Sequence, residues 1–144
     1  MVKWSTDRKI ELLKGVWLFS GCSFKELHHL GSVTDRVTIP DRTVIMTEGH
    51  SGRDLCVILE GRATATIGGR VVSELESGSF FGELALIDDG PRSATVVADG
   101  PVEALILTRN DFRALIETTP SVALKVLAVL GARLRDADDQ LTTG

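Results

Sequence analysis

The feature that most constrains the fold is a succession of short β-like runs between residues 33 and 107, each bounded by turn-forming residues. Many short strands at near-regular spacing favour a sandwich, a jelly roll or a barrel. No helical crossover lies between the runs, so a parallel α/β sheet is disfavoured. The runs cover residues 33–39, 43–47, 55–59, 63–67, 70–75, 93–98 and 102–107.

Glycines separate several of these runs. Gly68-Gly69 is typical of a two-residue β-hairpin, because both positions of such a turn require positive φ. The glycines at positions 61 and 100 are interpreted in the same way, as turns that divide one strand from the next.

Helical patterns flank the β-like region. Residues of about 7–30 are predicted to be helical, with breaks at Gly15 and Gly21. Ser23 and Glu26 have the spacing of a capping box, which predicts a helix start at that point. At 144 residues the chain can bury a core as one domain, so we expect a single domain over residues 1–144.

Two more helices are predicted after the β-like region, over about residues 108–139. Thr108 is expected to cap the first, and Pro120 to start the second. The second carries a heptad pattern formed by Ala123, Leu127, Leu130, Leu134, Ala137 and Leu141. Three interpretations stay open: this face packs on its own domain, it forms a dimer, or it serves as a lid.

The charge pattern bears on partners and location. The net charge is −4, and the densest basic spot, Arg133 and Arg135, is followed at once by three aspartates. Nucleic-acid binding leaves a footprint of clustered lysine and arginine, so we do not expect direct DNA binding. No apolar stretch approaches the roughly 20 residues of a membrane span, and no secretory leader is apparent, so we expect a cytoplasmic protein without a membrane span.

Cysteine and histidine do not form a metal or disulfide pattern. Cys22 and Cys56 are far apart and are predicted to be two buried thiols of a reducing compartment. His28 and His29 are adjacent, so on a helix they point in different directions, and His50 stands alone. We expect structural or surface histidines and no metal or other cofactor.

The segment FGELALIDDGPRSAT, residues 81–95, carries the candidate chemistry. Arg92 offers a rigid fork of donors that matches two phosphate oxygens, and Pro91 limits the freedom of the backbone before it. Glu83 can only accept hydrogen bonds, which suits a sugar hydroxyl. Gly82 allows close approach of a ligand, and residues 84–87 can form a helical turn whose N–H groups favour an anion.

A simpler interpretation treats Glu83 and Arg92 as a surface ion pair on an ordinary loop, worth about 0–1 kcal/mol. That interpretation suits an isolated pair. The complete segment, with its glycine, its helix formers and its proline, favours a ligand that has a phosphate at one end and a vicinal hydroxyl at the other.

The same segment resembles the phosphate-binding cassette of cyclic-nucleotide-binding domains, which occur in kinase regulatory subunits, gated channels and catabolite-activator-type regulators. The resemblance extends over about residues 10–139. It includes residues 16–21 and 24–27 as the opening helices, 47–49 and 54–61 as a glycine-punctuated strand, 78–83 before the cassette, and 112–115 with the final helix.

The resemblance implies an eight-stranded antiparallel β-roll over about residues 33–107, jelly-roll-like, with helices at both ends. It implies that Arg92 holds the cyclic phosphate and that Glu83 accepts the ribose 2′-hydroxyl. Backbone N–H groups near Leu84, Ala85 and Ser93 would complete the anion site, in which Gly82 and Ala94 are also expected.

Ser93 is compatible with cAMP and cGMP, and the family frequency favours cAMP. The residue that covers the base would come from the last helix, with Leu127, Leu130 or Arg133 as candidates.

Three functions follow as hypotheses. The first is a non-enzymatic cyclic-nucleotide sensor that signals through movement of the last helix to a protein partner or to a second copy. The second is a ligand-free dimerisation module that retains the cassette as structure. The third is a cupin-type β-barrel enzyme, which would need two or three inward histidines. The sequence ends at Gly144 without a segment that resembles a recognition helix, so we expect either a separate partner or a longer parent protein.

Overall fold

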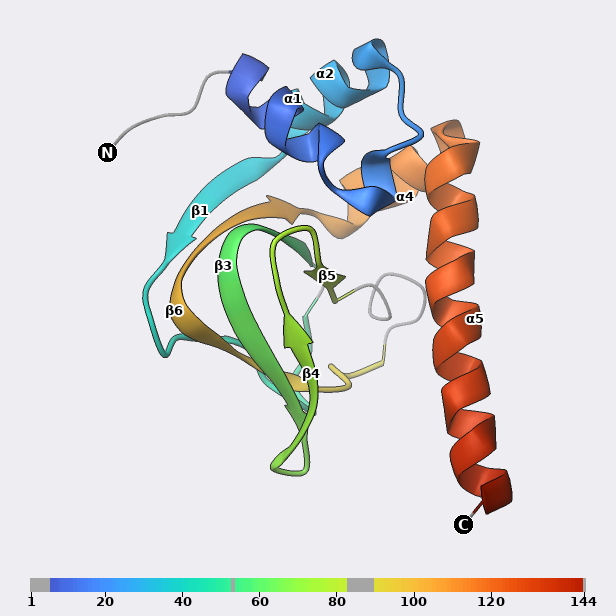
Figure 1. The fold of residues 1–144 in the computed structure, drawn as a ribbon. Coiled ribbons are helices and arrows are strands. Elements are labelled where there is room, and N and C mark those ends of the chain that lie inside the picture. Colours follow the sequence, from blue (N-terminus) through green and yellow to red (C-terminus); the bar gives the residue numbers. More distant parts are fainter. Residues whose placement is uncertain (1–5, 53, 83–89, 144) are drawn as a thin grey trace.

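The computed structural model describes residues 6–52, 54–82 and 90–143. An antiparallel roll forms the centre of the fold (Figure 1). The helices α1, α2 and α4 gather at one end of the roll, and α5 runs along its side. The described elements are α1 (Thr6–Lys14), the 3₁₀ helix η1 (Trp17–Phe19), α2 (Phe24–Val33), β1 (Asp35–Ile39), β2 (Val44–Met46), β3 (Leu55–Ile67), β4 (Arg70–Leu75), β5 (Phe80–Phe81), β6 (Thr95–Leu107), α4 (Arg109–Thr118) and α5 (Pro120–Thr143).

Within the described residues the sheet has six strands, in the order β1-β6-β3-β4, with β2 paired to β6 and β5 paired to β3. The prediction of a mainly antiparallel β fold with flanking helices is therefore confirmed, but the expected number of eight strands is wrong for the part of the chain that the structure describes. The strand β5 was not predicted, because two phenylalanines that pair with Cys56 and Val57 are too short a run to recognise.

Two predicted turns lie inside long strands. Residues 55–59 and 63–67 join as β3, and residues 93–98 and 102–107 join as β6, starting at Thr95. The register between β3 and β6 shifts on both sides of Glu60, which is the mark of a β-bulge. Gly61 has φ +103°, and a Cβ there would lie 2.4 Å from the Pro101 carbonyl oxygen. The glycine therefore bends a continuous strand pair instead of ending it.

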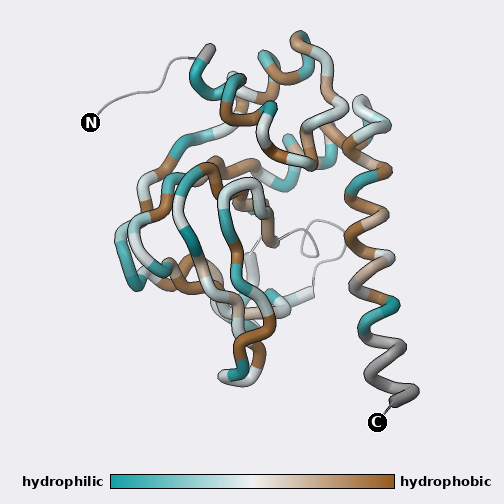
Figure 2. Tube along the Cα trace, viewed as in Figure 1, coloured by the Kyte–Doolittle hydropathy of each residue, from teal (hydrophilic) through white to brown (hydrophobic). Residues whose placement is uncertain are grey.

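The hairpin prediction is confirmed. Ile67 pairs with Arg70, and the two turn residues, Gly68 and Gly69, have φ +59° and +81°. Two positive φ values are what a type I′ turn requires. Figure 2 shows apolar residues near the tip of this hairpin, where Val71 and Val72 are exposed.

The helix starts follow the predicted caps. Ser23 and Glu26 form a complete capping box, with bonds of 3.2 Å and 2.7 Å. The Thr108 hydroxyl accepts from the Asp111 amide at 3.2 Å. The helix α2 continues through Val33, so the strand that follows it, β1, begins at Asp35 and not at residue 33.

The core has two parts. One cluster lies between the helices and the ends of β3 and β6, and includes Phe19, Leu30, Leu105 and Phe112. The second fills the roll, where alanine and other small side chains alternate with Ile58, Val96 and Val102. Cys56 is buried in this second cluster and Cys22 is half-buried, and both are free thiols.

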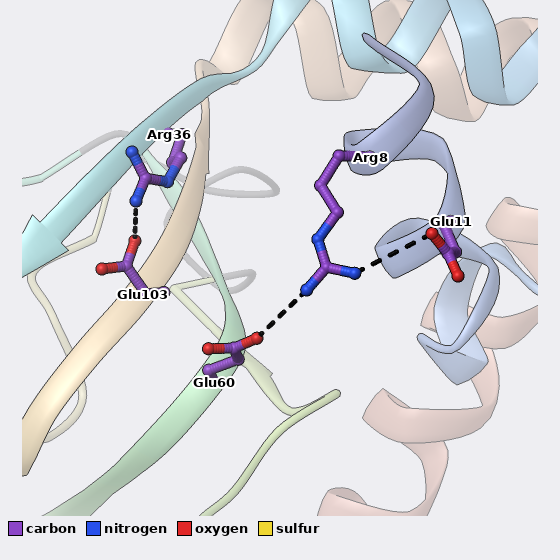
Figure 3. Close-up of polar contacts among 5 residues, drawn as sticks. All are labelled: Arg8, Glu11, Arg36, Glu60 and Glu103. Carbon is purple, nitrogen blue, oxygen red and sulfur yellow. Dashed lines mark ion pairs between the residues drawn. The ribbon is translucent and has the colours of Figure 1, made fainter. Parts of the chain in front are cut away.

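Two arginines form ion pairs with carboxylates at the bulge (Figure 3). Glu60 and Glu103 are cross-strand partners, an arrangement that is unfavourable for like charges. Arg36 lies 2.9 Å from Glu103, while Arg8 reaches from α1 to Glu60 at 3.7 Å. The second pair links the N-terminal helices to the middle of β3.

Within the described ranges, no helix by itself has the length and apolarity to cross a membrane. The helices α4 and α5 meet these criteria only when taken together, and they are bent by 111° where they join.

Candidate functional site

Arg92 is anchored by its backbone to the loop that follows β2. Its amide donates to the His50 carbonyl at 2.8 Å, and its carbonyl accepts from the Gly49 amide at 2.9 Å. The same loop is tied to β6, because the Glu48 amide donates to the Thr95 hydroxyl at 3.0 Å. These bonds fix the point from which the arginine side chain extends.

The guanidinium of Arg92 joins two further segments. Nη2 donates to the Asp54 carbonyl at 3.0 Å, at the start of β3, and Nη1 donates to the Gly82 carbonyl at 3.3 Å, just after β5. Carbonyl oxygens orient a guanidinium without neutralising its charge. The arrangement is therefore a half-buried, directed cation that can attract an anion.

Burial lowers the pKa of Arg92, while Asp54 and Cys56 act in the opposite direction. Arginine keeps its proton in proteins, so the charge is present at neutral pH. Burial also raises the pKa of the Cys56 thiol to about 12, with Arg92 as a smaller opposing influence. Cys56 is consequently a neutral thiol close to the cation and not a thiolate that competes for it.

Gly82 is close to the guanidinium. It has φ +96°, and an added Cβ would lie 2.7 Å from Nη1 of Arg92 and 2.6 Å from the Asp54 carbonyl oxygen. Ser93 is exposed, and Ala94 is buried in the inner core cluster. Of the predicted site residues, Gly82 and Arg92 are therefore in direct contact, while Glu83, Leu84 and Ala85 lie outside the described residues.

The contacts that hold the arginine could not be predicted from the sequence. Asp54 contributes through its backbone carbonyl, which leaves no trace in the choice of side chain. Gly52 contacts the guanidinium, but in the sequence it was interpreted only as part of a turn. The sequence offers only the position of Gly52, shortly before the strand that begins at Leu55, as an indication.

The first turns of α5 are fixed to the helical end of the domain. Val122 and Val126 are 0% and 4% exposed and belong to the helical core cluster. Lys125 donates to the Trp17 carbonyl at 3.0 Å and to the Ser20 hydroxyl, and its ammonium lies 5.5 Å from the centre of the Trp17 ring.

The face of α5 that the heptad pattern predicts differs for the most part from the face that packs on the domain. Leu127 and Leu134 are 62% and 65% exposed, and Leu130 is half-buried against the core. Packing on the domain is thus carried out by Val122 and Val126, while Leu127 and Leu134 of the seam remain at the surface. The side chain of Arg133 lies outside the described parts.

His28 and His29 are exposed on α2, in agreement with the surface interpretation, and the His28 ring lies 6.2 Å from that of Phe24. Among the residues the structure describes, no group of three or more His, Cys, Asp or Glu side chains could hold a metal ion.

Comparison with known proteins gives consistent results. Residues 36–119 match the family described as "Cyclic nucleotide-binding domain". The "Cyclic AMP receptor protein" of Thermus thermophilus is 37% identical over 134 residues, which cover 90% of this chain and 62% of that protein. The crystal structure of Thermus thermophilus catabolite activator protein superposes with a TM-score of 0.78 at 36% identity, over 86% of this chain and 61% of that one.

A second structure, the regulatory domain of Toxoplasma gondii PKA with cAMP, has a TM-score of 0.79 at 26% identity, over 88% of this chain and 50% of that one. The chain thus spans less than two thirds of the length of these relatives. The family match covers more than half of the chain, and on this basis the chain belongs to the cyclic nucleotide-binding domain family.

Proposed function

We propose that this domain is a non-enzymatic sensor that binds a 3′,5′-cyclic nucleotide, with cAMP favoured over cGMP, and that Arg92 holds the cyclic phosphate. The observation that supports it is the half-buried Arg92 guanidinium, directed by two carbonyl oxygens that leave its charge in place. The names of the relatives support the choice of cAMP, since they include a cyclic AMP receptor protein and cAMP-dependent protein kinase regulatory subunits.

The remaining roles follow the family pattern. Glu83 accepts the ribose 2′-hydroxyl, and the backbone N–H groups near Leu84, Ala85 and Ser93 complete the anion site. Gly82 and Ala94 line it. Gly82 supports this assignment most directly, because it touches the Arg92 guanidinium.

The output is proposed to be a movement of α5 that changes the surface offered to a protein partner or to a second copy. The support is the division of α5 into a packed start, at Val122 and Val126, and an exposed stretch with Leu127 and Leu134. A ligand shifts such an equilibrium only through its different affinity for the two positions of the helix. We also propose a cytoplasmic location. Direct contact with DNA is not expected, because the basic residues near the end of α5 are followed by aspartates.

Calorimetric titration with cAMP and cGMP tests the ligand assignment. Arg92→Leu removes charge-assisted bonds to the phosphate and is expected to weaken cAMP binding by about 2–4 kcal/mol. The circular dichroism spectrum of the variant provides the control for folding. Equal cAMP affinity of the wild type and Arg92→Leu would contradict the proposal.

A second candidate is a ligand-free dimerisation module, favoured by the exposed Leu127 and Leu134 on α5. Thermal denaturation with cyclic nucleotides separates the two candidates, with 5′-AMP as the control. A ligand at 100 times its dissociation constant should stabilise the fold by about 2.7 kcal/mol, whereas a ligand-free module should show no shift.

A further inference from the structure

We propose that Gly52 is a positioning residue, which keeps the Arg92 guanidinium in the orientation required for the ligand phosphate. The inference rests on the function proposed above. A Cβ added at Gly52 would lie 2.3 Å from Nε, 2.6 Å from Nη2 and 2.7 Å from Cζ of Arg92. Ordinary contacts of a Cβ begin at 3.4 Å, so any side chain at this position displaces the guanidinium by about 1 Å.

That displacement acts on the bonds that orient the arginine. Nη2 lies 3.0 Å from the Asp54 carbonyl oxygen and Nη1 lies 3.3 Å from that of Gly82. Hydrogen bonds of this kind do not survive stretching by 1 Å. The missing side chain of Gly52 is thus the reason why the guanidinium can lie on these two carbonyls.

Gly52 differs from Gly82 in what an added side chain would meet. At Gly82 the Cβ would also lie 2.6 Å from the backbone oxygen of Asp54, and φ is +96°, so the fold itself requires glycine there. At Gly52 the three nearest atoms all belong to the end of the Arg92 side chain, and φ is outside the positive region. A side chain end can move, so Gly52 constrains the direction of Arg92 more than the stability of the fold.

The test is a double-mutant cycle measured by calorimetric titration with cAMP. Its variants are Gly52→Ala, Arg92→Ala and the double variant, with Gly15→Ala as the matched control, because a Cβ at Gly15 comes no closer than 3.5 Å to another atom. We expect Gly52→Ala to weaken cAMP binding at least tenfold and Gly15→Ala to change it less than twofold. In the Arg92→Ala background, Gly52→Ala should cause no further loss.

A second measurement, on the protein without ligand, accompanies the double-mutant cycle. The ¹⁵N resonance of the Arg92 Nε, identified by its loss in Arg92→Ala, should shift in Gly52→Ala and stay in place in Gly15→Ala. If the wild type fails to bind cAMP, or if Arg92→Ala binds as tightly as the wild type, the proposed function is wrong, and the resonance still decides whether Gly52 positions the arginine.

Three results would overturn the inference: unchanged cAMP binding in Gly52→Ala, the same loss with and without Arg92, or an unshifted Nε resonance. If Gly52→Ala does not fold, the double variant should fold, because the group that the new Cβ meets has been removed. Failure of both variants to fold would place the role of Gly52 in the backbone and refute its role in positioning Arg92.

Discussion

Adjacent residues on α5 provide a sharp test of which face of the helix packs on the domain. Val126 is 4% exposed and lies in the helical core cluster, whereas Leu127, one position further, is 62% exposed and belongs to the heptad seam. Because Val126 packs in the core and Leu127 does not, Val126→Ala should destabilise the fold and Leu127→Ala should not.

The magnitude follows from the buried groups. Val126→Ala removes two methyl groups, each worth about 0.8 kcal/mol of transfer free energy, and adds a cavity term. Alanine is the better helix former by a few tenths of a kcal/mol, which offsets part of the loss. We expect a net loss of about 1–2 kcal/mol, or a decrease in Tm of roughly 2–8 °C for a domain of this size. Leu127→Ala should stay within about 0.5 kcal/mol.

Urea denaturation followed by circular dichroism measures both variants, at two protein concentrations. A folded monomer gives the same midpoint at both concentrations. Refutation would come from the reverse order, a large loss for Leu127→Ala that depends on concentration and a small one for Val126→Ala, since this is the behaviour of a helix whose stability comes from a second copy.

Two further predictions concern the roll. Gly61→Ala should lower the free energy of unfolding by about 2–4 kcal/mol in urea denaturation, because its Cβ would lie 2.4 Å from the Pro101 carbonyl oxygen at φ +103°. Gly100→Ala, which has positive φ but open space, should lower it by only about 1–2 kcal/mol, and similar losses in the two variants would contradict the close approach. The pKa of Cys56 is about 12 in the folded state against 9.0 ordinarily, so the unfolded chain loses its thiol proton first as the pH rises. The free energy of unfolding should therefore fall by about 1 kcal/mol between pH 9 and 10. The same decrease in Cys56→Ala would show that another group is responsible.

The elements with a local cause could be predicted from the sequence. The Gly68-Gly69 hairpin, the capping box at Ser23 and the cap at Thr108 each depend on residues within a few positions of one another. Their hydrogen bonds are short-range, so the residue types alone specify them.

The strand count could not be predicted, because it depends on pairing between distant segments. Gly61 has the appearance of a turn residue in the sequence, and only the close approach of Pro101 shows that it bends a continuous strand. The same holds for β5, whose identity as a strand comes from its pairing with Cys56 and Val57.

The candidate site likewise combines features that the sequence predicts with features that only the fold brings together. Arg92 could be chosen from its residue type and its neighbours, because a guanidinium matches two phosphate oxygens and Pro91 limits the backbone before it. Its partners could not, because the carbonyls of Asp54 and Gly82 and the bare Cα of Gly52 are backbone features that the fold brings together. The assignment of the whole chain to one domain stays a prediction.

The contact between Lys125 and Trp17 has a practical consequence. The ammonium of α5 lies 5.5 Å from the centre of an indole that is 52% exposed at the other end of the chain. A nearby positive charge alters the emission of an indole, so any change in how α5 sits against the first helices alters the fluorescence of this tryptophan. With Trp4 replaced by phenylalanine, so that Trp17 is the one emitting tryptophan, its fluorescence is therefore expected to report the position of the start of α5 without an added dye.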